Sequence, residues 1–145
     1  MKYTQTVFST SGERFYNITQ QVQTALDDLL KQSPSPSGIL TLFNPHTSCA
    51  LTINEAHDIS AANDMENFLK HLAPRELPFI THTMEGSDDS PSHMKSILLQ
   101  TSLQMIVEEG NLVMGTWQGI YLCEFRDAPK QRSLYLKFIP DHSAL

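Results

Sequence analysis

The sequence contains few cysteines. Only two, Cys49 and Cys123, occur in 145 residues, and they are too few and too far apart to form a disulfide framework. Cys49 lies three residues after His46, and an odd separation along an extended chain places two side chains on opposite faces. We therefore expect an inert thiol at Cys49.

Basic residues and long apolar runs are also scarce. Ten Lys and Arg residues stand against 16 Asp and Glu residues, so the formal net charge is −6 at pH 7, which argues against nucleic-acid or anionic-membrane binding through a basic surface. One local cationic pocket for a phosphorylated small molecule is still compatible with this charge. No apolar run approaches the roughly 18 residues of a membrane span, and residues 1–6 lack the apolar core of a secretory signal. We expect a cytoplasmic protein.

The composition is that of an ordinary globular protein, with 40% hydrophobic and 18% charged residues. Its length predicts one domain, 1–145, that is large enough to bury a core. Strands are predicted from alternating or continuous apolar residues at 3–8, 39–43, 50–54, 103–108, 112–114, 117–125 and 134–139. Helices and strands are mixed early in the chain and strands dominate later, which predicts a compact α+β fold with a largely antiparallel β-sheet.

Two or three helices are expected. Apolar residues recur with helical spacing at residues 19–32 and 58–72, and Asp58 is suited to cap the second helix while Pro74 closes it. Ser90 followed by proline predicts a third, short helix that ends near residue 100. The side chains expected to face the core are Val22, Ala25, Leu26, Leu29 and Leu30 in the first helix and Ile59, Ala62, Met65, Leu69 and Leu72 in the second.

Three of the six histidines lie where chemistry is usually found. His46, His82 and His93 are in loops or at the ends of elements, where a scaffold commonly presents functional groups. His93 lies near a helix N-terminus, which favours the neutral imidazole that binds metal. No His-x-x-x-His or Cys-x-x-Cys pattern occurs, so surface or capping histidines are the alternative interpretation.

Three carboxylates lie between His82 and His93. Glu85, Asp88 and Asp89 could orient a histidine, hold a hard cation or act as a general base, or they could form a solvated acidic loop. Glu55 ends an apolar strand and could point into a cleft.

A glycine-rich segment offers an anion site. Two glycines frame a hydroxyl, the single tryptophan and an amide in Gly115-Thr116-Trp117-Gln118-Gly119. Glycine allows close approach of a ligand to exposed backbone amides, although the glycines could equally mark bulges beside a packed Trp117. Arg126, a little further on, is suited to phosphate or to an ion pair with Asp127.

These segments together resemble the YjbQ-like family, often labelled secondary thiamine-phosphate synthases. The matching stretches cover nearly the whole chain in order, and they are Phe43-Asn44-Pro45-His46-Thr47-Ser48, Leu51-Thr52-Ile53-Asn54-Glu55, His82-Thr83-Met84-Glu85-Gly86, Asp88-Asp89, Pro91-Ser92-His93-Met94-Lys95, Ser102-Leu103, Gly115-Thr116-Trp117-Gln118-Gly119-Ile120-Tyr121 and Cys123-Glu124-Phe125. The resemblance implies a compact α+β fold, a homotrimer and a pocket near the subunit boundaries. It also implies that His46, His82 and His93 gather around a metal or a small anion, with zinc expected, or magnesium if the substrate carries pyrophosphate.

The family label implies a transferase, in which a thiazole phosphate nitrogen displaces pyrophosphate from an aminopyrimidine, as a weak activity. Charge builds on the departing oxygens, so donors and a cation are needed more than a protein nucleophile. The alternatives are a metal-dependent hydrolase and a non-catalytic binder of a phosphorylated metabolite. The expected catalytic residues are Glu85, Asp89 and His93, and the expected substrate-binding residues are Thr116, Gln118, Gly119, Arg126 and Glu55.

Overall fold

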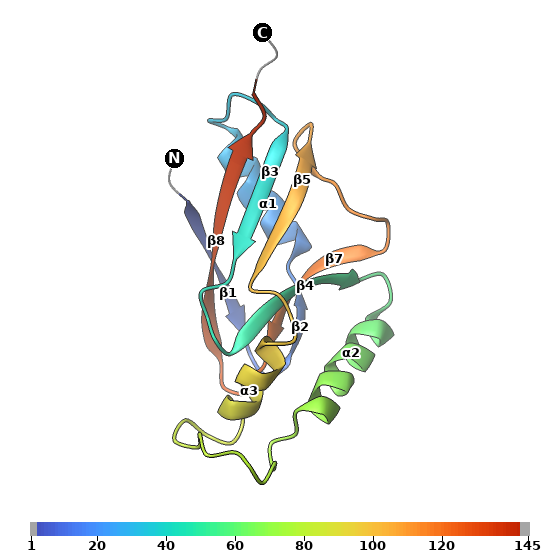
Figure 1. Ribbon diagram of the computed structural model, residues 1–145. Helices are drawn as coiled ribbons and strands as arrows, with labels where there is room; N and C mark the ends of the chain where they lie inside the picture. Colours follow the sequence, from blue (N-terminus) through green and yellow to red (C-terminus); the bar gives the residue numbers. More distant parts are fainter. Residues whose placement is uncertain (1–2, 143–145) are drawn as a thin grey trace.

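The computed structural model describes residues 3–142, which form eight strands and three helices (Figure 1). In chain order they are β1 (Thr4–Thr10), β2 (Arg14–Asn17), α1 (Thr19–Leu30), β3 (Gly38–Phe43), β4 (Cys49–Glu55), α2 (Ile59–Leu72), α3 (Asp89–Ser96), β5 (Ser102–Glu108), β6 (Asn111–Leu112), β7 (Gln118–Glu124) and β8 (Lys130–Pro140). None of the described helices has both the length and the apolar character that crossing a bilayer requires.

The strands form two antiparallel sheets, which confirms the predicted fold class. One sheet has the order β1-β8-β3-β5-β6 and the other has the order β2-β7-β4. Strand β2 was not expected from the sequence. Only Phe15 of its four residues is buried, so the strand carries too little alternation to be recognised, and it pairs with β7 along its whole length.

The main core lies between the two sheets and α1. The alternation of β3 buries Leu40 and Leu42 while Ile39 and Phe43 face outward, as a half-buried strand requires. From α1, Val22 and Leu26 are fully buried against these strands and against one face of the smaller sheet. The apolar stripe predicted for this helix is therefore confirmed at its centre.

The smaller sheet is buried on both faces, because α2 covers the side that α1 does not. Along β7, six consecutive residues from Gly119 to Glu124 are buried, which explains why this strand shows no alternation. Asp58 caps α2 as predicted, since its side chain accepts a hydrogen bond from the Ser60 amide at 2.9 Å. Ile59 and Leu72 were expected in the core but are exposed, because the sheet covers only the middle turns of this helix.

A buried ion pair joins the two sheets. Arg132 of β8 donates to both carboxylate oxygens of Glu124 of β7, at 2.7 and 2.5 Å, and Glu124 is completely buried. Thr10 also donates to this carboxylate at 2.6 Å, and Arg132 donates to the Ser48 hydroxyl at 2.9 Å. Burial alone would raise the pKa of Glu124, but the hydrogen bonds from Arg132 and Thr10 hold it below its ordinary value.

We expect Glu124→Gln to destabilise the fold strongly. The substitution leaves the Arg132 guanidinium buried without a counter-charge, which costs about 3–5 kcal/mol. Urea unfolding at pH 7 measures this loss. The control is the double variant Glu124→Leu/Arg132→Met, which removes both charges and should recover most of the stability. A single variant that is as stable as the unmodified protein would show that the pair is not needed.

The expected homotrimer stays a prediction, and the outer face of the larger sheet is the surface where we expect copies to meet. This face carries an exposed apolar cluster, in which Ile39 lies opposite Ile106 and Ile139 on the neighbouring strands. Light scattering should give about three times the monomer mass of 16.3 kDa. Ile106→Glu should lower that mass, whereas Ile59→Glu on exposed α2 should not. A monomeric unmodified protein contradicts this prediction.

Candidate functional site

Two histidines and one aspartate meet at the start of α3. Asp89 and His93 are four residues apart on the helix and therefore share one face, and His82 reaches the same place from the preceding loop. The His82 Nε2 atom lies 2.8 Å from Asp89 Oδ2, and His93 Nε2 lies 3.2 Å from the same oxygen. One ligand atom from each residue lies within 4.8 Å of the others. The expected meeting of His82 and His93 is therefore observed.

The orientation of His93 is set by the backbone. Its Nδ1 atom lies 2.8 Å from the Thr47 carbonyl oxygen, which can only accept a hydrogen bond, so Nδ1 carries the hydrogen. In a neutral ring the lone pair is then on Nε2, which faces the carboxylate of Asp89. Two facing acceptors need a proton or a cation between them, so the donor set fits a metal. Imidazole and carboxylate ligands of this number suit zinc with an open coordination position, and they also occur at ferrous iron sites.

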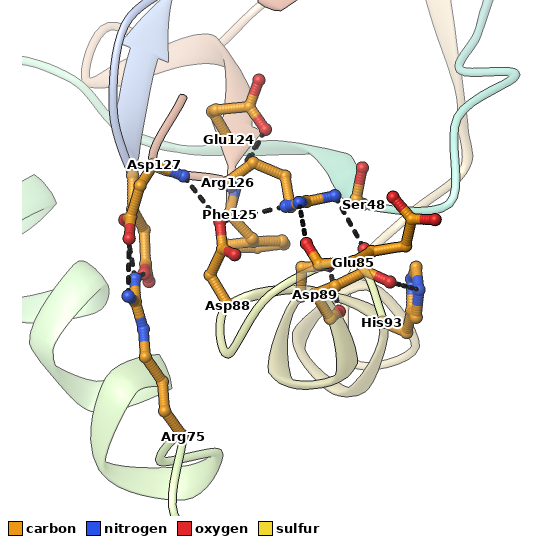
Figure 2. A network of polar contacts seen from close by, with 12 residues as sticks. Ser48, Arg75, Glu85, Asp88, Asp89, His93, Glu124, Phe125, Arg126 and Asp127 are labelled. Carbon is orange, nitrogen blue, oxygen red and sulfur yellow. Dashed lines mark hydrogen bonds and ion pairs between the residues drawn. The ribbon is translucent and has the colours of Figure 1, made fainter. Parts of the chain in front are cut away.

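Asp89 is held as a carboxylate. Burial would raise its pKa, but the hydrogen bond with His82 and the charges of His93 and Arg126 lower it below its ordinary value. Its other oxygen, Oδ1, accepts from Arg126 Nη1 at 2.8 Å, as Figure 2 shows. Asp89 therefore presents only Oδ2 to the two histidines.

Arg126 is a positioning residue in this structure, because its guanidinium is held by acceptors of the same chain. Besides Asp89, it donates from Nε to Asp88 Oδ2 at 3.0 Å and from Nη2 to the Glu85 carbonyl oxygen at 2.8 Å (Figure 2). All three nitrogens are thus used within the protein. The alternative of an ion pair with Asp127 is therefore wrong, because the carboxylate partners of Arg126 are Asp88 and Asp89, and phosphate binding by Arg126 stays a prediction.

A second ion-pair network contacts α3 through Lys95. Lys95 of α3 is almost fully buried and donates to Glu13 Oε2 at 2.7 Å. Arg75 bridges Glu13, at 3.3 Å, to Asp127, at 2.5 and 2.6 Å. This network was not expected from the sequence, because a lysine on a polar helix is normally a solvent-exposed residue and no local pattern indicates its partner 82 residues away.

A groove of about 750 Å³ opens beside the cluster. Within the described part of the chain, no lysine, arginine, aspartate or glutamate lines it. The lining residues are His46, Thr47, Cys49, Ala50, His82, His93, Ser96, Ile97, Leu99, Gln100 and Thr101. The lining therefore combines three histidines with neutral polar and apolar side chains from β4 and from the end of α3 onward. Cys49 contributes an inert thiol, as expected, because burial raises its pKa to about 12.

His46 lines the same groove but lies outside the cluster of His82, Asp89 and His93. Its Nε2 atom lies 3.0 Å from the Ser133 amide nitrogen and 3.2 Å from the Ser133 carbonyl oxygen. Burial and then the positive charge of Arg132 lower the pKa of His46 below its ordinary value. The expected set of three histidines is thus replaced by two histidines and Asp89 among the described residues. Spacing could not show this, because the competing partner comes from β8.

The other expected substrate-binding residues lie at the opposite end of β4 and β7. Glu55 Oε2 accepts from the amides of His57 and Asp58, and Gln118 Oε1 accepts from the Gly115 amide. None of Glu55, Thr116, Gln118 and Gly119 lines the groove. Strand β4 spans roughly 20 Å at about 3.3 Å per residue, and only its first residues, from Cys49, reach the groove.

Local contacts account for the glycine at position 119 and for the place of Trp117. A side chain on Gly119 would bring its Cβ to 2.4 Å from that of Ala56, so glycine is required there by close strand packing. Trp117 is exposed and meets the His57 ring edge-on, with centroids 4.5 Å apart. Trp117 thus packs on His57 while more than half of its surface stays exposed, and the segment does not line the groove with the histidines.

The fold and the site together define a small α+β protein with two antiparallel sheets and a two-histidine, one-aspartate cluster beside a neutral groove. The family model for "UPF0047 protein YjbQ-like" matches residues 3–141, and the chain belongs to that family. It is 40% identical over 129 residues to a UPF0047 protein of Methanocaldococcus jannaschii, covering 89% of this chain and 87% of the relative. It is 37% identical over 131 residues to the UPF0047 protein YugU of Bacillus subtilis, covering 90% and 93%.

Solved structures have the same fold. The crystal structure of a conserved hypothetical protein from Thermus thermophilus matches with a TM-score of 0.81 and 36% identity, covering 94% of this chain and 99% of that one. The two-sheet architecture and the three helices are therefore features of solved relatives as well.

We expect Arg126→Ala to lower the free energy of unfolding by about 1.5–3 kcal/mol at pH 7, because Asp88 and Asp89 lose a charged hydrogen-bond donor. Burial raises the pKa of Asp88, but hydrogen bonds from the Asp127 amide and Arg126 lower it overall. The stability that Asp88 contributes is fully present above the ordinary pKa of an aspartate. It is lost as the pH falls through the lowered pKa of Asp88. The difference between the two proteins should therefore shrink below about pH 4.

Urea unfolding between pH 7 and pH 3.5 measures this difference. Arg126→Lys is the matched variant and should recover only part of the stability, since an ammonium group cannot reach all three acceptors in the geometry of the guanidinium fork. Equal stability of Arg126→Ala and the unmodified protein at pH 7 would contradict the positioning role.

Proposed function

We propose that this protein is a metal-dependent small-molecule enzyme whose centre is formed by His82, Asp89 and His93. The observation that carries this proposal is the convergence of two imidazole Nε2 atoms on one carboxylate oxygen at the mouth of a groove. The donor set favours zinc, with three protein ligands and one open position. A proton shared within the cluster is the alternative that metal analysis distinguishes.

The chain prepares this centre in two ways. The Thr47 carbonyl holds the His93 ring so that Nε2 faces the cluster, and Arg126 occupies one oxygen of Asp89 so that the other remains available. Such supporting contacts typically change metal affinity or activity by 10–100-fold when they are removed. Divalent zinc at such a position supplies Lewis acidity and activates a water for attack at neutral pH.

Glu85 is the candidate general base. It lies in the loop between His82 and Asp89, is bound to Arg126 through its backbone oxygen, and has an exposed side chain (Figure 2). A carboxylate in such a place can accept a proton from an attacking water. Asp89 and His93, which the sequence placed among the catalytic residues, are assigned here to holding the metal.

Hydrolysis of a small substrate is better supported by the groove than transfer with a pyrophosphate leaving group. Among residues 3–142 no lysine or arginine lines the groove, and each guanidinium nitrogen of Arg126 already donates to a partner within the chain. A thiamine-phosphate synthase reaction would therefore depend on a bound cation, such as magnesium, to balance the pyrophosphate charge. That weak transferase activity is the second proposal, and it rests on the resemblance to the family label.

The proposed centre predicts that metal content depends on His82. His82→Ala should lose stoichiometric metal, because one of three ligands is removed, whereas His71→Ala should keep it. His71 is the matched control, since it is an exposed histidine in the last turn of α2. Elemental analysis for zinc, iron, manganese and magnesium gives the readout, and it also identifies the metal.

Equal metal content in the two variants, or no metal in the unmodified protein after growth with added zinc, contradicts the proposed centre. A metal-loaded protein that hydrolyses neutral esters points to the hydrolase. Pyrophosphate release from the aminopyrimidine and thiazole substrates points to the transferase. Bound metal with neither of these activities points to a non-catalytic protein that binds a phosphorylated metabolite.

A further inference from the structure

One dipeptide fastens both ends of the loop between α2 and α3. At the start of the loop, Arg75 donates to the two carboxylate oxygens of Asp127, at 2.5 and 2.6 Å. At its end, Asp88 Oδ2 accepts from the Asp127 amide at 2.9 Å and from Arg126 Nε at 3.0 Å. Figure 2 shows these contacts. The loop of residues 75–88 is therefore closed on itself, with both ends on the Arg126-Asp127 segment that follows β7.

Between these ends the loop has few contacts. Residues 81–87 are all exposed. Within the part of the chain that the structure describes, the hydrogen bonds of residues 76–84 stay inside the loop, except for the contact between His82 and Asp89. Segments with little burial and few contacts open at low free energy. The place of His82 therefore depends on how firmly the ends of the loop are held.

Arg75 is the anchor on the α2 side of the loop. Two parallel hydrogen bonds from one guanidinium to one carboxylate fix direction as well as distance. Arg75 Nη2 also lies 3.3 Å from Glu13 Oε1, and Glu13 pairs in turn with the buried Lys95 of α3 at 2.7 Å. Isolated exposed ion pairs contribute little to stability, but a bidentate pair within a network is the exception. The pairing of Arg75 is therefore suited to hold this side of the loop.

From these contacts we infer that Arg75 is a positioning residue of the metal centre, which holds the loop so that His82 stays opposite Asp89. Asp89 and His93 both belong to α3, whereas His82 is brought by the loop. Releasing the loop lowers the fraction of molecules in which all three ligands face one another, and the apparent metal affinity falls with that fraction. The inference rests on the proposed function, because it takes His82 as a metal ligand.

Zinc titration against a competing chelator tests the inference. Arg75→Ala should weaken zinc binding by about 3- to 10-fold, the range for a partly exposed but bidentate ion pair, and should still bind one zinc per chain at saturation. Arg75→Lys should recover only part of the affinity, since an ammonium group cannot form the two parallel hydrogen bonds. His82→Ala, which removes a ligand, should lose stoichiometric zinc instead.

Two further variants separate positioning from a general loss of stability. Asp127→Asn removes the charge that Arg75 contacts but keeps the backbone amide that donates to Asp88. It should weaken zinc binding, and the double variant should bind about as weakly as Arg75→Ala alone, because one contact is lost only once. Val22→Ala creates a cavity in the main core, so it should unfold at lower urea but bind zinc within about twofold of the unmodified protein.

The contact between two histidine rings gives a readout in the metal-free protein. The ring centroids of His82 and His93 lie 5.4 Å apart, which gives a nuclear Overhauser effect between the rings, and this effect should weaken in Arg75→Ala. Unchanged zinc affinity or an unchanged ring contact in Arg75→Ala, additive losses in the double variant, or an equal loss of zinc affinity in Val22→Ala would each overturn the inference. Absence of zinc binding by the unmodified protein would overturn the proposed centre, and the ring contact would then decide whether Arg75 positions His82.

Discussion

The buried pair of Glu124 and Arg132 is the interaction on which the rest of the site depends. A buried carboxylate must be paired and fully hydrogen-bonded, and here it collects donors from both sheets. The same carboxylate accepts from the Arg126 amide at 3.2 Å, and Arg132 reaches the Ser48 hydroxyl at 2.9 Å. Arg126 positions Asp89, and Ser48 adjoins Thr47, which orients His93. Both walls of the candidate site are thus attached to one ion pair in the core.

The use of positive charge explains the character of the groove. Around the site, Arg126, Arg132, Arg75 and Lys95 all pair with carboxylates of the same chain. The pairs of Lys95 and Arg126 contact α3 directly and are largely buried, so salt screens them weakly. The cationic side chains around the site therefore stabilise the structure. The groove itself is lined by histidines and by neutral polar and apolar side chains.

Sequence reasoning succeeds where the determinants are local. The cap at Asp58, the strand at 39–43 and the stripe of α1 depend on residues within one element, and the structure confirms all three. The meeting of His82 and His93 was expected from their places and from the family resemblance. The carboxylate partners of Arg126 lie 37 and 38 residues away in the sequence. Ser133, which contacts the His46 ring, lies 87 residues away. Such contacts depend on tertiary packing, which spacing along the chain does not encode.

The two kinds of histidine in the groove are distinguished by which nitrogen the backbone occupies. The Thr47 carbonyl takes the Nδ1 hydrogen of His93, so the lone pair on Nε2 faces Asp89. The Nε2 atom of His46 instead lies 3.0 Å from the Ser133 amide nitrogen and 3.2 Å from the Ser133 carbonyl oxygen. The backbone therefore directs the His93 ring into the cluster with Asp89, whereas it ties the His46 ring to β8 of the larger sheet.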